Sequence, residues 1–449
     1  MGVKQVKIDV AEITIGMFVS GLDRPWTQTP FPIQGFYVHD LDQIKQLKTH
    51  CNYIYVDVTK GAAPALANLK ALDTRHKSRD SNQRVKPSSN APLLPLKVNL
   101  STYPKQETLE KEARRARQLH QRVFGAVGEV MVQVGSGKFT SVHETKRVAG
   151  SMVDSILRNP DAFTWLSRIR DQDEHTYGHA VRSAVWAILL GRHIGLAKLE
   201  LDILALAVLL KDVGKTHVRR ELLLDDDRST QGQAEFEGFI DKGVEILKKI
   251  PGVEPRVVAI VKTHCERING SGFPRHLKGD SIPLLGKIAG IVTFYDEVIN
   301  PRGASSPVAP SQAVSHLYEV RGLEFQEDLV VEFIRAIGLY PTGTLVELTT
   351  GQVGIVLEQN FERRLKPKIM LLLNEFKQPL KRRKLLDLAK DDMIKQALID
   401  SGKRRLDEVE KIEIAQDLES GSYNIDVNEI RDTYLLKSFS QNLLSFFKP

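Results

Sequence analysis

Apolar residues recur at helical spacing over most of the chain between residues 106 and 340. From 176 to 194 they mark one face of an amphipathic helix, whereas the segment 199–210 is apolar all round, as a helix at the centre of a core would be. Residues 106–159 show the same period, with one break near 135–138. Further helices are expected at 234–249, 253–264, 284–299, 311–319 and 327–337. This pattern predicts a mainly α-helical bundle.

The period of the apolar residues changes to two after Pro341, which indicates β-structure. Residues 345–348 and 353–357 are expected to pair as a hairpin, and 369–373 is expected to add a third strand. Beyond Leu385 the tail is charged and partly helical. The helical bundle is therefore expected to continue into a short C-terminal β extension.

The first 58 residues carry short β-like runs at 16–19 and 53–58, which predict a small α/β or mostly β domain. Pro, Ser, Asn and scattered charged residues then dominate, as in a flexible linker. The expected segments are the N-terminal domain 1–58, the linker 59–105, a helical connector 106–160, the bundle 161–341, and a β-hairpin extension with a charged helical tail, 342–449.

The composition fits a globular protein, because 449 residues with 42% apolar and 27% charged content can bury a sizeable core. No charged segment followed by an apolar run opens the sequence, and the richest apolar stretch is too short to span a bilayer. The only cysteines are Cys51 and Cys265, too few for a disulfide framework. The expected location is therefore the cytoplasm.

The net charge of +7 and the pI of about 9.1 favour acidic partners such as nucleotides, nucleic acid or anionic lipid. Part of the excess lies in eight lysines and arginines between residues 363 and 383. This cluster is either solvated surface or an anion-binding patch. It lacks the interleaved aromatic residues on which single-stranded bases stack, and nucleic acid is therefore not the expected partner.

Three elements of the helical region place polar residues where a plain bundle would not. His179 lies inside an amphipathic helix, one turn after His175. Asp212 ends the most apolar helix of the chain, where an ionised carboxylate needs a cation or several hydrogen-bond donors nearby. The third element is the loop 264–274, whose closely spaced glycines and final proline let the backbone turn tightly beside a bound group.

The order of these motifs resembles the HD-GYP family of cyclic di-GMP phosphodiesterases. The resemblance covers roughly residues 165–345 and rests on the run at 175–179, the segment 209–215, the loop 264–274 and the pair Tyr295-Asp296. It implies an HD-superfamily helical bundle. Residues 1–58 also resemble a small domain often found ahead of it.

In such enzymes two or three iron or manganese ions are held by His and Asp side chains and convert a bridging water into a hydroxide that attacks the phosphodiester. Carried over residue by residue, the ligand pattern is preserved at His179, Asp212 and His264. It is substituted at Lys211, Phe239, Cys265 and Thr293. The resemblance therefore predicts a degenerate metal site with little or no hydrolytic activity and no bound cofactor; any residual metal would be iron or manganese.

Two alternatives concern the substituted positions. Lys211, or Lys215 one turn on, would neutralise a buried Asp212 in place of the lost metal, or Lys211 would extend to solvent. Cys265 and His175 would add donors to one weak metal site.

The ligand-binding side of the family pattern is better preserved. Lys215 and Arg267 match cationic positions suited to phosphate, and the segment Gly272-Phe273-Pro274 stands where the family has Gly-Tyr-Pro. The Phe273 ring could still stack on guanine. The Arg- and Tyr-containing segment usual after Tyr295-Asp296 is replaced by residues 300–307, which weakens the case for nucleotide binding.

Three functions are compatible with this pattern. The preferred one is a non-catalytic nucleotide receptor or protein-binding regulator of cyclic di-GMP signalling. The second is an active phosphodiesterase that yields the linear dinucleotide, with Asp212 and Lys215 as catalytic residues. The third is a scaffold without nucleotide binding. Cyclic di-GMP and signalling proteins are the candidate partners, and the oligomeric state stays open.

Overall fold

The computed structural model describes twelve ranges: residues 5–23, 36–38, 41–57, 96–99, 102–138, 141–167, 175–225, 227–302, 308–360, 363–401, 411–419 and 421–436. Most of the predicted linker lies outside these ranges. Within them, no helix combines the length and apolar character that crossing a membrane requires. The chain divides into two compact units, Met1–Pro92 and Leu93–Pro449.

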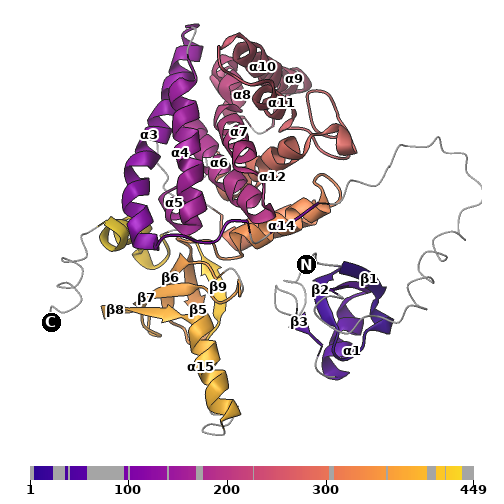
Figure 1. Ribbon diagram of the computed structural model, residues 1–449, viewed down its shortest axis with the longest axis vertical. Helices are drawn as coiled ribbons and strands as arrows, with labels where there is room; N and C mark the ends of the chain where they lie inside the picture. Colours follow the sequence, from indigo (N-terminus) through magenta and orange to yellow (C-terminus); the bar gives the residue numbers. More distant parts are fainter. Residues whose placement is uncertain are drawn as a thin grey trace, which may run out of the picture. The chain divides into compact units, whose positions relative to one another are not determined.

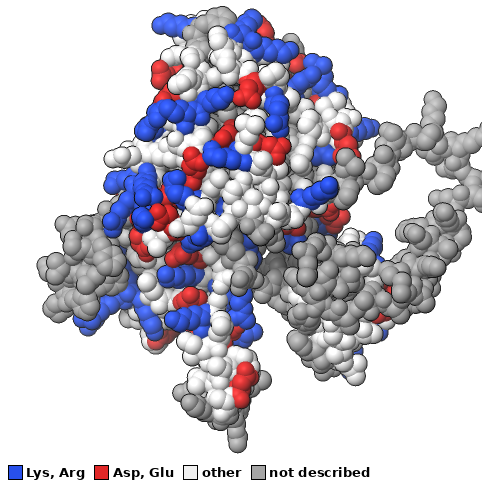
Figure 2. All heavy atoms as spheres, viewed as in Figure 1, with Lys and Arg blue, Asp and Glu red and all other residues white. Residues whose placement is uncertain are grey.

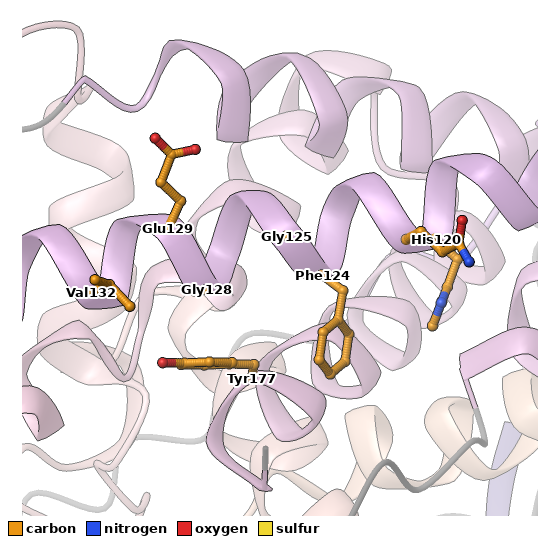
Figure 3. A pocket seen from close by; sticks show the side chains of 8 residues that line it. His120, Phe124, Gly125, Gly128, Glu129, Val132 and Tyr177 are labelled. Carbon is orange, nitrogen blue, oxygen red and sulfur yellow. The ribbon is translucent and has the colours of Figure 1, made fainter. Parts of the chain in front are cut away.

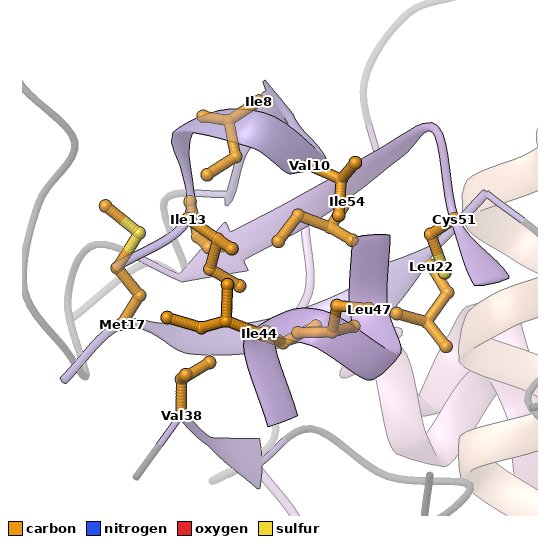
Figure 4. Close-up of a cluster of buried hydrophobic side chains, with 12 residues drawn as sticks. Ile8, Val10, Ile13, Met17, Leu22, Val38, Ile44, Leu47, Cys51 and Ile54 are labelled. Atoms are coloured by element: carbon orange, nitrogen blue, oxygen red, sulfur yellow. The ribbon is translucent and has the colours of Figure 1, made fainter. Parts of the chain in front are cut away.

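The first unit is an antiparallel sheet covered by one helix. Its strands are β1 (Gln5–Asp9), β2 (Phe18–Leu22), β3 (Phe36–Tyr37) and β4 (Tyr53–Asp57), in the order β1-β4-β2-β3. The 3-10 turn η1 (Val10–Glu12) and helix α1 (Leu41–His50) complete it. Figure 4 shows Ile44 and Leu47 of α1 directed toward Ile54 and Leu22 of the sheet, all of them buried. Of the two predicted architectures, this unit is therefore α/β.

The second unit contains the predicted connector and helical bundle (Figure 1). The long helices α3 (Leu109–Gly135) and α4 (His143–Arg158) lie side by side, separated by the predicted break. The other elements of the bundle are α5 (Pro160–Ser167), α6 (His175–Ile194), α7 (Lys198–Leu210), η3 (Val213–His217), α8 (Arg220–Leu224), α9 (Thr230–Glu237), α10 (Phe239–Lys249), α11 (Pro255–Thr263), η4 (Gly279–Ser281), α12 (Leu284–Ile299), α13 (Pro310–Glu319) and α14 (Glu327–Ile337). Helices α12 and α14 begin and end at the predicted residues.

The single helix predicted at 234–249 is wrong, because the chain forms two helices, α9 and α10, with a break at Gly238. The start of α10 lies close to η3. A Cβ atom on Gly214 would lie 1.9 Å from the carbonyl oxygen of Phe239, so only glycine fits at this contact. The contact holds Phe239 against the turn that carries Lys215.

The chain then forms a five-stranded antiparallel sheet of order β8-β7-β6-β5-β9. The predicted hairpin is confirmed as β5 (Leu345–Leu348) and β6 (Val353–Glu358), and the predicted third strand is β7 (Lys368–Leu373). The edge strands β8 (Pro379–Asp387) and β9 (Ile414–Leu418) were not predicted. The remaining elements are α15 (Leu388–Asp400), η6 (Ser422–Asn424), α16 (Val427–Arg431) and η7 (Asp432–Leu436).

The sheet shares a hydrophobic core with the bundle. Leu109 of α3 and Trp165 of α5 are buried in one cluster with Leu345, Ile355 and Met370 of the sheet. Figure 1 shows the sheet beneath the ends of α3 and α5, with α15 projecting away from it. The β extension is therefore packed onto α3 and α5.

The basic cluster at 363–383 does not form one continuous patch. Arg363 pairs with Asp392 at 3.0 Å, and Lys368 pairs with Glu358 at 3.2 Å. By contrast, Lys381 on β8 is exposed. On the face shown in Figure 2, basic and acidic side chains are intermixed. Part of the positive charge is thus neutralised within the fold.

Candidate functional site

Lys211 and Asp212 lie at the buried end of helix α7. The helix is apolar from Leu201 onward apart from Asp202, and its last seven residues are fully enclosed. Lys211 is the C-cap of α7 and Asp212 is the residue directly before η3, so both polar side chains emerge inside the bundle. Each has an exposed fraction of 0%. A buried carboxylate at this position requires a compensating charge.

Two ammonium groups supply that charge. Nζ of Lys211 donates a hydrogen bond to Oδ2 of Asp212, and Nζ of Lys215 lies 2.7 Å from Oδ1 of the same carboxylate. The alternative in which Lys211 extends to solvent is therefore wrong. The other alternative named Lys211 or Lys215 as the group that neutralises Asp212, and in the structure both residues contact its carboxylate.

These contacts shift the ionisation of all three groups. Burial favours the neutral form of Asp212, but Lys211 and Lys215 outweigh it and hold the pKa of this carboxyl well below its ordinary value. Burial lowers the pKa of Lys211, although Asp212 opposes the shift. Against burial, Asp212 and Glu297 raise the pKa of Lys215. The arrangement is a carboxylate held between two cations.

His179, on α6, is oriented by a second buried carboxylate. Its Nδ1 lies 2.8 Å from Oδ2 of Asp296, on α12. Arg182 donates from Nε and Nη2 to both oxygens of Asp296, and Trp186 and Asn300 donate at 3.3 and 3.2 Å. Burial alone would raise the pKa of Asp296, but Arg182 and His179 lower it. Asp296 is therefore an ionised acceptor, and Nδ1 of His179 is the donor.

This orientation directs the other ring nitrogen of His179 into the site. Its Nε2 lies 3.9 Å from Oδ2 of Asp212 and 3.8 Å from Oε1 of Glu297, a half-exposed side chain. Burial and the charge of Lys211 lower the pKa of His179. The imidazole is therefore neutral at pH 7 with its lone pair on Nε2.

His264 follows α11 and is 1% exposed. Its Nδ1 donates to the carbonyl oxygen of Val261 at 2.8 Å. Burial, followed by the charge of Lys211, lowers the pKa of His264 to about 3. Within the described residues its buried Nε2 has no hydrogen-bond partner. This nitrogen is thus an acceptor without a donor.

The three other substituted positions offer little to a metal. The Phe239 ring packs 6.1 Å from the ring of His264. Burial raises the pKa of the Cys265 thiol to about 12, so the thiol stays protonated at neutral pH and is a poor ligand. Thr293 is 5% exposed and presents a neutral hydroxyl. The side chain of His175 lies outside the described residues.

The residues present do not fit the polynuclear centre of HD-GYP enzymes. In the described part of the chain, no three His, Cys, Asp or Glu side chains are grouped so that they could hold a metal ion. An ammonium group already lies on the retained carboxylate, where a divalent ion would meet a like charge. The expected absence of a cofactor itself stays a prediction.

The glycine-rich loop packs tightly beside these residues. A Cβ atom on Gly272 would lie 2.3 Å from the carbonyl oxygen of Cys265, so the close approach requires glycine. The carboxylate of Glu266 accepts hydrogen bonds from the backbone N–H groups of Arg275 and Leu277. The peptide bond between Phe273 and Pro274 is cis. The loop is therefore fixed by its own backbone contacts.

Two predicted ligand contacts differ in their surroundings. The Phe273 ring is partly exposed and lies 6.2 Å from the ring of Phe239, close to the buried charges. The Arg267 guanidinium instead lies 4.6 Å from the Phe325 ring and 3.4 Å from Glu324. Arg267 is thus engaged by the segment before α14.

The structure brings together six of the predicted site residues, and it adds others that the sequence reasoning missed. Against burial, the pKa of Asp212 is lowered by Lys211, Lys215, His179 and His264. Lys215 also lies 4.9 Å from the centre of the Phe239 ring. The missed residues are Arg182, Trp186, Asn300 and Glu297. Arg182 lies three residues after His179, a spacing that places both side chains on one helix face and that could have identified it.

A separate pocket of about 450 Å³ lies between α3 and the first turn of α6. Figure 3 shows Phe124 and Glu129 of α3 and Tyr177 of α6 around it. The pocket contains none of the predicted site residues, although Tyr177 precedes His179 by two positions. It is distinct from the buried charge cluster.

Two family models match the chain. The model described as a domain of unknown function, DUF3391, matches residues 5–145, and the HD domain model matches residues 166–329. The second match contains the whole cluster of Lys211, Asp212, Lys215, His179 and His264.

Named relatives also match the chain. The cyclic di-GMP phosphodiesterase PA4108 of Pseudomonas aeruginosa is 28% identical over 374 residues, which cover 82% of this chain and 85% of that protein. The 3'3'-cGAMP-specific phosphodiesterase 2 of Vibrio cholerae is 30% identical over 167 residues, 36% of this chain and 31% of that protein. The solved structure of Bd1817, a HDG"Y"P protein from Bdellovibrio bacteriovorus, covers 74% of this chain and 98% of its own at 16% identity and a TM-score of 0.43. With the HD domain match and the relatives, the chain belongs to the HD-GYP family.

Proposed function

We propose that this chain is a non-hydrolytic receptor for a cyclic dinucleotide in cyclic di-GMP signalling. The observation that carries the proposal is the Lys211–Asp212–Lys215 cluster, in which two ammonium groups take up the carboxylate that a metal centre would use. Without a metal-bound hydroxide the cluster provides no nucleophile for the phosphodiester. It keeps a cationic group suited to a phosphate.

The choice of ligand rests on the relatives. One is named for cyclic di-GMP and another for 3'3'-cGAMP, and both ligands are cyclic dinucleotides with two phosphodiester groups. Lys215, the part of the cluster that retains some exposure, would contact one of these groups. The partly exposed Phe273 ring would stack on a purine base.

Charge in and around the cluster limits how the ligand binds. Lys211, Lys215 and Asp212 sum to one positive charge, but Glu297 adds a negative charge at the edge of the site. Glu297 is half exposed, so water screens it more than the buried groups. The cluster therefore attracts a phosphate monoanion only moderately.

The test is calorimetric titration of the full-length protein with cyclic di-GMP and, separately, 3'3'-cGAMP, followed by chromatography of the nucleotide after incubation with Mn²⁺ or Fe²⁺. The expected result is binding without linear product. Linear product above that of a Lys211→Ala/Asp212→Ala control would establish a phosphodiesterase instead. The absence of binding by either nucleotide would overturn the receptor function and leave a protein-binding regulator or a scaffold.

A matched pair of variants ties binding to the cluster. Lys215→Met is expected to weaken binding by about tenfold or more, the effect of losing one charge-assisted hydrogen bond. Lys248→Met removes an exposed lysine of α10 and serves as the control. Equal affinities for the two variants would contradict the placement of the ligand at Lys215.

A further inference from the structure

The charge cluster keeps the surroundings of a metal centre although its cation is an ammonium group. His179 is held through Nδ1 by Asp296, and His264 is held through Nδ1 by the carbonyl oxygen of Val261. Imidazoles that bind metals are typically held by their second nitrogen in this manner, which leaves the lone pair of the first for the ion. In both histidines Nδ1 is therefore the nitrogen that the fold holds.

The ammonium group of Lys211 lies against the retained carboxylate. It contacts Oδ2 of Asp212, the same oxygen that lies 3.9 Å from Nε2 of His179. Its charge also lowers the pKa of both His179 and His264, second only to burial. One cation therefore acts on the carboxylate and on both imidazoles.

Lys211 cannot make room for a divalent ion by turning to solvent. Its side chain is fully buried, at the end of a helix whose neighbouring residues Leu209, Leu210 and Val213 are also fully buried. A metal ion bound to Asp212 would stand beside a positive charge in a site of low dielectric, where the repulsion is strong. The ammonium and the metal thus exclude one another.

We propose that the Lys211 ammonium occupies the place of the metal ion and that, of the two ammonium groups on Asp212, it is the one that keeps divalent cations from the retained side chains. The inference goes beyond the receptor function and does not depend on nucleotide binding. If the proposal holds, replacing the Lys211 ammonium by a metal-binding side chain, as in Lys211→His, should open the site to a divalent ion. This variant removes the ammonium and adds an imidazole to His179, Asp212 and His264, a nitrogen-rich set that suits Zn²⁺ and other transition metals.

The test uses the metal alone. The wild type, Lys211→His and the control Lys248→His are dialysed to equilibrium against Zn²⁺, and bound metal is counted by mass spectrometry of the full-length protein. Lys211→His is expected to bind about one ion more per chain than Lys248→His, whereas the wild type should bind no more than Lys248→His. The melting temperature of Lys211→His should rise with Zn²⁺ and fall again with EDTA.

Two further variants locate the gained ion and allow for a failure of Lys211→His to fold. Lys211→His/His264→Gln should lose the gained ion, which assigns it to this site. Lys211→Met serves as the test if Lys211→His does not fold. It removes the ammonium, retains His179, Asp212 and His264, and should bind Zn²⁺ at least tenfold more tightly than the wild type. The proposal is overturned if the wild type itself holds a chelatable ion at Asp212, or if both folded variants gain no metal. Neither result bears on nucleotide binding, which is measured separately.

Discussion

Replacing Lys211 by methionine tests how the buried carboxylate is stabilised. Methionine approximates the length of the lysine side chain without its charge, so the packing at the end of α7 changes little. Asp212, with an exposed fraction of 0%, would then keep Lys215 as its remaining ammonium partner. The variant therefore isolates the contribution of one of two cations.

The expected loss follows from the cost of an incompletely paired buried charge. Removing one partner of a buried ion pair typically costs about 3 to 5 kcal/mol. Because Lys215 remains 2.7 Å from Asp212, we expect the lower end, about 3 kcal/mol. At about 2 °C per kcal/mol, this corresponds to a melting temperature lower by roughly 6 °C.

The assay is urea unfolding of the wild type, Lys211→Met, Asp212→Asn and the double variant. Removing both charges leaves no unpaired carboxylate. The double variant should therefore lose roughly 2 kcal/mol less free energy of unfolding than the two single losses added together. The control Lys248→Met should lie within about 0.5 kcal/mol of the wild type. Additive losses, or a Lys211→Met loss no larger than that of the control, would refute the buried pair.

Three further predictions concern the surroundings of the pair. His264 has a pKa of about 3 in the folded chain against 6.5 ordinarily, so between these pH values the unfolded chain binds a proton that the folded chain does not. The free energy of unfolding therefore falls by up to about 1.4 kcal/mol per pH unit as the pH drops from 6.5 toward 3. In urea unfolding between pH 7 and 5, His264→Gln should reduce this slope by about one proton, and an unchanged slope would contradict the assignment. Gly272→Ala should cost about 2 kcal/mol because its Cβ would collide with the Cys265 carbonyl, whereas Gly125→Ala on α3, which meets nothing within 4 Å, should not destabilise the protein in the same melting experiment. Glu297→Gln should tighten nucleotide binding by roughly two- to threefold in calorimetry by removing a half-exposed competitor for Lys215, and weaker binding would show that the carboxylate contacts the ligand.

The helices could be predicted from sequence where burial follows the helical period. Helix α14 carries its apolar residues on the face that the bundle buries, and α12 is a largely apolar run that the bundle encloses, so their bounds follow from the pattern alone. The strands β8 and β9 could not be predicted in this way. β8 is an exposed edge strand with lysines and arginines in its middle, and its sequence resembles that of a solvated tail.

The site was predictable as a set of residues but not as a set of contacts. The motif order singled out Lys211 and Asp212, and it left open whether the lysine turns inward. That choice is decided by the tertiary packing around η3, where Gly214 meets the backbone of Phe239 and encloses the end of α7. Arg182 was not singled out because its partner, Asp296, lies 114 residues away.

The two buried carboxylates of the site, Asp212 and Asp296, differ in what neutralises them, and this difference explains why a lysine at position 211 matters where metal ligands are substituted. Asp296 is neutralised by Arg182 and His179, partners that need no metal. Asp212 has no comparable arginine among the described residues, and a neutral side chain at position 211 would leave it with Lys215 alone. Without a metal ion beside it, such a carboxylate would destabilise the fold by several kcal/mol. The ammonium of Lys211 removes that penalty because it reaches the carboxylate from the adjacent residue. With Lys211 in this place, the bundle can keep the Asp212 carboxylate buried beside His179 without needing a metal ion to neutralise it.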